Sequence, residues 1–116
     1  VSPSTADGRI CEIVSRGSGF IYAVSVAGVT GARTGLSESA RTLLQRVVPK
    51  SSLPVVLGFG ISAPEHVAHA MQAGARGVVE GSALVSVYAS LIEDRRRALE
   101  KAAEHAVAMR AATCSH

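Results

Sequence analysis

Two glycine-bearing segments each follow a short apolar run, and their residue types suit the binding of an anion. Gly58-Phe59-Gly60-Ile61-Ser62 follows residues 54–57, and Gly81-Ser82 follows residues 77–80. Glycine lets backbone N–H groups approach an anion closely, and the start of a following helix adds unpaired donors and a positive dipole end. The Ser82 hydroxyl is a further donor. Together the two loops predict a phosphate site, although a tight strand-to-helix turn also explains each glycine taken singly.

A third loop extends this prediction. Residues 27–35 contain three glycines and two threonines, which is typical of a loop. Such a segment can close over the mouth of a site, and Gly31 can offer another N–H to the anion. Thr30 either orients a catalytic group or caps the next helix, and spacing alone leaves both roles open. The sequence has no G-x-G-x-x-G segment opening a helix, which argues against a dinucleotide site.

The strands and helices that must carry these loops can be recognised by two different spacings of apolar residues. Short, nearly continuous apolar runs predict strands buried on both faces, as in a parallel sheet. Apolar residues at a spacing of three and four predict helices between and after the runs. The expected strands cover residues 20–26, 54–57 and 77–80, and the expected helices begin near residues 4–7, 37, 62 and 82, the last as a small helix followed by a long helical tract to near the end.

Local signals accompany the helix starts. A Ser4–Asp7 segment resembles a capping box, and Ser62-Ala63-Pro64-Glu65 has the full pattern with proline in the first turn. The strand and helix order predicts right-handed βαβ units, hence an α/β fold with a parallel sheet. A doubly wound sheet and a barrel remain open, and both place ligands at the carboxyl ends of the strands.

Length and composition limit the function classes. The 116 residues suit one domain, residues 1–116, yet a complete (β/α)8 barrel needs roughly 250 residues. Two Phe, two Tyr and no Trp leave few rings for stacking bases, so nucleic-acid binding is not expected. We expect Arg95–Arg97 to be a solvated helix face, Cys11 and Cys114 to be free thiols in a reducing cytoplasm, and no membrane span.

At the glycine loops the chain closely resembles the carboxyl-terminal part of the tryptophan synthase alpha chain family. Three stretches carry the resemblance, in the family's order and at about its spacings, and the similarity extends from Val1 to about Ala112. They are Gly19-Phe20-Ile21-Tyr22-Ala23-Val24-Ser25-Val26-Ala27-Gly28-Val29-Thr30-Gly31-Ala32-Arg33, Gly58-Phe59-Gly60-Ile61-Ser62-Ala63-Pro64-Glu65 and Gly81-Ser82-Ala83-Leu84-Val85.

The resemblance implies a (β/α)8 TIM-barrel enzyme of tryptophan biosynthesis. That lyase cleaves indole-3-glycerol phosphate to indole and glyceraldehyde 3-phosphate by a retro-aldol reaction. It passes indole to a beta chain in an α2β2 assembly, and pyridoxal phosphate belongs to the beta chain, so no cofactor is expected here. On this alignment Val1 falls at the end of strand five, and the chain is a partial barrel with about strands six to eight.

Site residues are implied one by one. The backbones of Gly31, Gly60 and Gly81, with the side chain of Ser82, would hold the substrate phosphate. Tyr22, Phe59 and Val79 would line the indole pocket, and Thr30 would help to position a catalytic carboxylate. The family's catalytic Glu and Asp lie on early strands, which these residues do not include. We therefore assign no catalytic residue and expect the 116-residue chain alone to be inactive or incomplete.

Glu80 departs from the family, which has a small or apolar residue there. Alternation along the strand points Glu80 away from the pocket if Val79 points inward. We expect an outward-facing carboxylate paired with an arginine, and the alternative is a replacement catalytic group. The four histidines show no metal pattern, and we expect exposed helix positions for them: His66, His69, His105 and His116.

Two other functions compete with the enzyme. One is a non-catalytic phosphate-binding module built from a half barrel, which would keep the anion loops and self-associate to complete a sheet. The other is a different phosphate-binding barrel enzyme, such as a relative from the histidine or thiamine pathways. The Gly28–Arg33 stretch argues against this last interpretation.

Overall fold

The fold is built on a parallel sheet of three strands in the order β1-β2-β3. The computed structural model describes residues 1–25, 36–58 and 60–114. The strands are β1 (Ile21–Val24), β2 (Val55–Gly58) and β3 (Gly77–Val79), and β2 lies between the other two. Each strand falls within one apolar run and is at most four residues long. The parallel α/β prediction is therefore confirmed.

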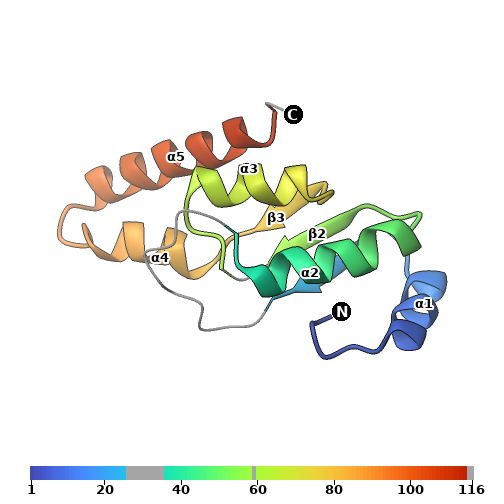
Figure 1. Ribbon diagram of the computed structural model, residues 1–116. Coiled ribbons are helices and arrows are strands. Elements are labelled where there is room, and N and C mark those ends of the chain that lie inside the picture. The colour runs from blue at the N-terminus through green and yellow to red at the C-terminus, as the bar shows by residue number, and fades with distance from the viewer. Residues whose placement is uncertain (26–35, 59, 115–116) are drawn as a thin grey trace.

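Helices precede, separate and follow the strands (Figure 1). Helix α2 contacts β1 and β2, and α3 contacts β3 and α5. The Ser37 side chain caps α2 by accepting a hydrogen bond from the Ala40 N–H at 3.1 Å, as its position before the apolar periodicity predicts. The helices are α1 (Asp7–Arg16), α2 (Glu38–Val47), the short 3-10 helix η1 (Val48–Lys50), α3 (Pro64–Gln72), α4 (Ser82–Ala89) and α5 (Arg95–Ala112).

The long helical tract expected after residue 90 begins later than predicted. The small helix α4 opens at Ser82 as expected and ends at Ala89, and α5 starts only after Asp94. The Asp94 carboxylate accepts a hydrogen bond from the Arg97 N–H at 3.2 Å, so this residue starts a new helix. The buried side of α5 is formed by Ala98 and Met109, whereas Leu99 is 56% exposed.

The helix starts expected near residues 4–7 and 62 are confirmed, but the capping residues differ from the predicted ones. Helix α1 has Ala6 at its N-cap, without a side-chain cap. At α3 the N-cap is Ala63, and the acceptor is the imidazole of His66 instead of the Glu65 carboxylate. Nδ1 of His66 accepts from the N–H groups of Ser62 at 3.1 Å and Ala63 at 3.2 Å. His66 is consequently buried, which corrects the expectation that it is exposed.

The hydrophobic core lies on one face of the sheet. The register aligns Ile21 with Val55 and Ala23 with Leu57, and all four side chains are buried. Helices α2 and α3 complete this core with residues of the expected apolar stripes: Ala40, Leu43, Leu44, Val47, Val67 and Ala70. The core is aliphatic, as the scarcity of aromatic residues predicts.

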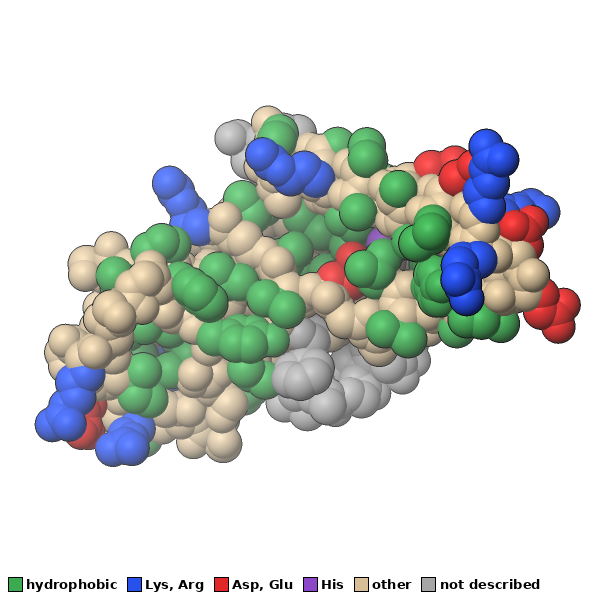
Figure 2. All heavy atoms as spheres, turned by 180° about the vertical axis from the view of Figure 1, so that it is seen from behind, with side chains coloured by type: hydrophobic (Ala, Val, Ile, Leu, Met, Phe, Trp, Pro, Cys, Tyr) green, Lys and Arg blue, Asp and Glu red, His purple; other side chains and the backbone are tan. Residues whose placement is uncertain are grey.

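The opposite face of the sheet carries fewer buried side chains, and we refer to it as the open face. Strand alternation places Tyr22, Val56, Gly58 and Val79 on it, and Tyr22 and Val79 are exposed. Figure 2 shows the side of the molecule turned away from α2, where hydrophobic side chains gather over the middle around an acidic side chain, and most other charged side chains lie toward the edges. The open face is therefore an apolar surface over the middle of the sheet.

The amino-terminal segment is held to the body of the protein by Arg46 of α2. Its guanidinium donates to the Asp7 carboxylate at 3.0 Å and to the backbone oxygens of Pro3, at 3.1 Å, and Thr5. Lys50 adds an ion pair with Asp7 at 3.2 Å. These cations, Arg46 first, lower the pKa of the Asp7 carboxyl below its usual value by hydrogen bonding.

Truncation of a core leucine should destabilise the fold strongly. Leu57 is completely buried in the middle strand, so Leu57→Ala leaves a cavity and should lower the free energy of unfolding by about 2–5 kcal/mol. Urea titration followed by circular dichroism measures the loss. The matched control is Leu99→Ala at an exposed site, where we expect less than about 1 kcal/mol. Equal losses in the two variants would contradict the assigned core.

Acid should weaken the contribution of Asp7 to stability. Since its pKa is lower in the folded chain, Asp7 stabilises the fold above its unfolded pKa, and this contribution is lost as pH falls through the folded pKa. The difference in thermal midpoint between the parent and Asp7→Asn should therefore shrink on acidification. The Asp7 side chain is 65% exposed, so the difference is small and salt should reduce it further. Glu100→Gln, which removes an exposed pair within α5, is the control.

Candidate functional site

The carboxyl ends of β1 and β2 are joined by Ser25, the residue that follows β1. Its hydroxyl donates to the Gly58 carbonyl at 3.1 Å, and its N–H donates to the same oxygen at 3.2 Å. The Ser25 side chain is buried. These contacts bring the loop after β1 and the loop after β2 to the same edge of the sheet. Sequence reasoning missed Ser25, although a lone hydroxyl inside the apolar run 20–26 was a usable signal.

The loop after β2 has a backbone that requires glycine. Gly60 has φ +75°, a left-handed conformation that side-chain-bearing residues rarely adopt. A methyl group placed on Gly60 would have Ser25 Oγ as its nearest neighbour at 3.8 Å, so the backbone is exposed on this side. The predicted phosphate residue Gly60 therefore lies beside the joined ends of β1 and β2.

The loop after β3 begins a helix that has no side-chain cap. Gly81 is the N-cap of α4, Ser82 is its first residue, and both are exposed. The first N–H groups of an α-helix have no partners within the helix. Because β3 pairs with β2, the Gly81–Ser82 turn lies at the same sheet edge as Gly60. The fold thus brings together the predicted phosphate residues Gly60, Gly81 and Ser82.

Two of the predicted pocket residues lie on the open face, next to this edge. Tyr22 is 38% exposed and Val79 41% exposed, and the register places Val79 beside Gly58. A Cβ atom on Gly58 would lie 2.2 Å from the Tyr22 hydroxyl oxygen, so the phenol ring covers this glycine. The apolar surface and the glycine loops are therefore adjacent. The other predicted site residues, Thr30, Gly31 and Phe59, lie outside the described residues.

The partner of Glu80 is a histidine and not the expected arginine. The carboxylate Oε1 forms a hydrogen bond with Nε2 of His105 on α5. The exposed fractions of the two side chains are only 12% and 18%. The expectation that His105 is exposed is therefore wrong, because its imidazole bonds to Glu80 and α5 packs against α3 and α4.

Of the other residues considered in the sequence, some lie as expected and some do not. His69 is half-buried on α3, so it is not an exposed residue, and its Nδ1 has no partner within the described part of the chain. His116 lies outside that part. Both cysteines are free and exposed, and Arg95–Arg97 are exposed as expected. A search of the described residues finds no group of three metal-ligating side chains and no helix long and apolar enough to cross a membrane.

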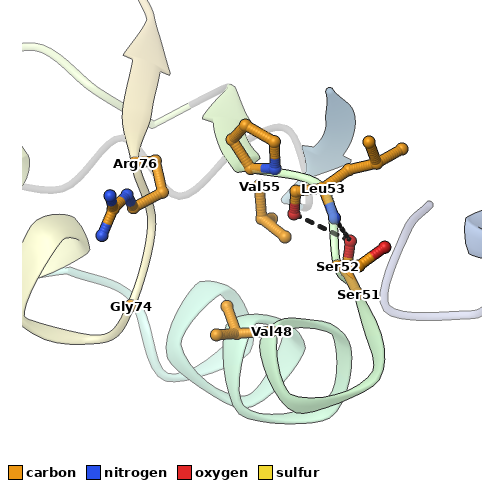
Figure 3. Close-up of a pocket in the computed structure, with 8 residues that line it drawn as sticks. Val48, Ser51, Ser52, Leu53, Val55, Gly74 and Arg76 are labelled. Atoms are coloured by element: carbon orange, nitrogen blue, oxygen red, sulfur yellow. Dashed lines mark hydrogen bonds between the residues drawn. The ribbon is translucent and has the colours of Figure 1, made fainter. Parts of the chain in front are cut away.

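A depression of about 350 Å³ lies at the opposite end of the sheet (Figure 3). It is lined by residues before β2 and β3, including Leu53, Gly74 and Arg76, and the Ser51 hydroxyl donates to the Leu53 carbonyl within it at 2.8 Å. In (β/α)8 barrels, residues at the amino ends of the strands contribute to stability, and active sites lie at the carboxyl ends. The depression is therefore not the candidate site.

A three-stranded parallel sheet with helices between its strands, and with glycine loops at its carboxyl edge, defines a piece of an α/β protein. The family profile described as "Tryptophan synthase alpha chain" matches residues 1–114. The chain belongs to the tryptophan synthase alpha chain family, which confirms the resemblance found in the sequence.

Individual relatives agree with the profile. The tryptophan synthase alpha chain of Methanothermobacter thermautotrophicus is 44% identical over 112 residues, which are 97% of this chain and 42% of that protein. The Arabidopsis thaliana alpha chain is 46% identical over 86 residues, 74% of this chain and 31% of the relative. This chain thus spans less than half the length of these relatives.

Solved structures show the same partial match. A chain from the tryptophan synthase α2β2 complex of Pyrococcus furiosus superposes with a TM-score of 0.81 at 37% identity, covering 96% of this chain and 44% of that one. The separate alpha subunit of the same organism gives a TM-score of 0.79 at 34% identity, covering 96% and 43%. The fold is therefore that of part of a TIM-barrel subunit.

The contact between Tyr22 and Gly58 can be tested by a pair of substitutions. Gly58→Ala should displace the Tyr22 ring and lower the free energy of unfolding, because the new methyl group would overlap the phenol. In a Tyr22→Ala background the same change should cost much less, and urea titration of the four proteins measures this coupling.

Gly77→Ala is the matched control for this experiment. Gly77 is also a strand glycine on the open face, but its added methyl would meet only Val56 Cγ2, at 3.7 Å. Its cost should be small and the same with or without the Tyr22 ring. Additive effects of Gly58→Ala and Tyr22→Ala would contradict the contact.

Proposed function

We propose that the complete protein is the alpha chain of tryptophan synthase, which cleaves indole-3-glycerol phosphate to indole and glyceraldehyde 3-phosphate. In this proposal the present residues supply the phosphate-binding end of the barrel. The observation that carries it is the convergence of Gly60 with Gly81 and Ser82 at one sheet edge, in a chain of this family.

The strands β1, β2 and β3 are proposed to be strands six, seven and eight of the barrel. Support comes from the backbone of Val1, which lies beside β1 on the edge opposite β2. The Val1 amino group donates to the Tyr22 carbonyl at 2.8 Å, and the Val24 N–H donates to the Val1 carbonyl at 2.8 Å. This is the pairing expected from the end of strand five.

The site is proposed to bind the substrate in two parts. Backbone N–H groups around Gly60 and Gly81 and the Ser82 hydroxyl hold the phosphate, which suits an uncapped helix start. Gly31 adds a further N–H. The apolar open face, with Tyr22 and Val79, provides a wall against which the indole ring can pack. Phe59 belongs to the same wall, and Thr30 positions a catalytic carboxylate.

The retro-aldol step needs a general acid to protonate the indole ring and a base near the glycerol hydroxyls. Among the described residues Glu80 is the carboxylate that directly follows a strand, and it bonds to His105. We propose that the acid and the base come from strands outside these 116 residues, and that this chain alone does not turn over substrate. Glu80 is not the replacement catalytic group.

The proposed partner is a beta chain in an α2β2 assembly. Support comes from the related chain in the Pyrococcus furiosus complex, whose title names such an assembly. Pyridoxal phosphate is assigned to that beta chain, and the alpha chain needs no cofactor in this proposal. The proposed cellular location is the cytoplasm, where biosynthetic enzymes with free thiols operate.

A second candidate is a phosphate-binding module without catalytic activity. It is supported by one observation: the carboxylate that directly follows β3, that of Glu80, is bonded to His105, while the helix start at Gly81 has no side-chain cap and is left for an anion. The two candidates share the phosphate site and differ in catalysis, so one binding assay and one activity assay separate them.

Phosphate binding is tested by calorimetric titration of the 116-residue chain with glycerol phosphate. We expect binding, and we expect Ser82→Ala to weaken it about tenfold, since a hydrogen bond to a charged group contributes about 1.5 kcal/mol or more. Ser86→Ala, an exposed serine one turn further along α4, is the matched control and should bind like the parent. Equal affinity of Ser82→Ala and the parent would refute the assigned phosphate loop.

Catalysis is tested by indole release from indole-3-glycerol phosphate. The 116-residue chain should release none, and the full-length Methanothermobacter thermautotrophicus alpha chain serves as the positive control. A chimera that joins the unmatched part of that relative to this chain should recover activity if the enzyme proposal is right. Phosphate binding by a folded chimera without indole release would favour the module. Indole release by the 116-residue chain at the rate of the positive control would contradict the assignment of the acid and base.

A further inference from the structure

We propose that Glu80 and His105 form a positioning pair that fixes the phosphate-binding loop between β3 and α4 against helix α5. The proposal rests on the function proposed above, and it gives a role to the residue at which this chain departs from its family. Neither side chain is assigned a contact with the substrate.

The pair joins the loop to a distant part of the chain. Glu80 is the first residue after β3 and directly precedes Gly81, the N-cap of α4. Its partner His105 lies 25 positions later, in the second half of α5. Both side chains are mostly shielded from water, with exposed fractions of 12% and 18%. A hydrogen bond to a carboxylate that is shielded from water constrains its neighbours more than an exposed contact does.

The loop needs such a constraint because the sheet holds it on one side only. Strand β3 pairs with β2, and this pairing ends at Val79. Gly81 has no side chain, and no side chain caps the helix that it begins. The direction of the N–H groups at the start of α4 therefore depends on contacts with α5. Helix α4 packs along α5, and the Glu80–His105 bond adds a fixed point directly beside the glycine.

Simple electrostatics and positioning predict opposite effects of removing Glu80. A carboxylate beside an anion site repels phosphate, so charge alone predicts that Glu80→Ala binds phosphate more tightly. If the carboxylate positions the loop, Glu80→Ala binds phosphate more weakly although a negative charge has been removed. The sign of the change therefore separates the two explanations.

The experiment compares the parent chain with Glu80→Ala, His105→Ala and the double variant. Calorimetry with inorganic phosphate should show each single variant binding about threefold more weakly or worse, as expected for the loss of one charge-assisted hydrogen bond. The double variant should bind no more weakly than the worse single variant, because both substitutions remove the same contact. Glu80→Gln keeps the size and an acceptor oxygen, and it should recover part of the affinity.

Amide hydrogen exchange supplies a measurement that does not depend on phosphate. Exchange at residues 81–83 should become faster in Glu80→Ala, while the loop at residues 60–63 remains as in the parent. Glu104→Ala is the matched control, because this neighbour of His105 pairs with Lys101 on the exposed side of α5 at 3.2 Å. It should change neither the affinity nor the exchange.

The outcomes separate the two proposals. A parent chain that binds no phosphate would refute the proposed phosphate site, and exchange at residues 81–83 would still test the pair. If Glu80→Ala binds phosphate as tightly as the parent or more tightly, with unchanged exchange, the positioning role is overturned. If Glu80→Ala does not fold, exchange at residues 81–83 in His105→Ala decides, because the remaining carboxylate would itself repel phosphate in that variant: faster exchange supports the positioning role, and unchanged exchange overturns it.

Discussion

Parallel hydrogen bonding of three short strands is the constraint on which the rest of this structure depends. Parallel pairing sends every strand in the same direction, so all following loops emerge at one edge. Ser25, Gly60 and Gly81 follow three different strands and are far apart in the sequence, yet they meet at this edge for that reason. The hydrogen bonds from Ser25 to the Gly58 carbonyl then fix two of the loops relative to each other.

The same pairing divides the sheet into two faces with different roles. The face under α2 and α3 holds the aliphatic core, which stabilises the fold by burying Leu57 and its neighbours. The open face keeps Tyr22 and Val79 exposed next to the glycine loops. In a closed barrel this face would be the interior, so one surface would serve both to bind the substrate and to contact further strands.

Several features could be predicted from the sequence because they depend on local patterns. The three strands, the start of α2 at Ser37 and the short helix opening at Ser82 follow from apolar runs, a capping serine and a glycine turn. Other predictions were wrong for two different reasons. At two helix starts a nearby polar side chain competed with the expected pattern: the imidazole of His66 replaced the expected cap of α3, and Asp94 divided the expected helical tract. Glu80 instead bonds to His105 on α5, 25 positions away, which no local pattern predicts.

The sequence by itself determined the family, the parallel α/β class and the glycine loops that follow the strands, because these depend on motifs and periodicity within short segments. Only the tertiary structure decided how Ser25 joins two of these loops, which face of the sheet is open and which residue bonds to Glu80. The physical reason is that strand register and helix packing are set by burial of the whole core, and this burial couples residues that are tens of positions apart.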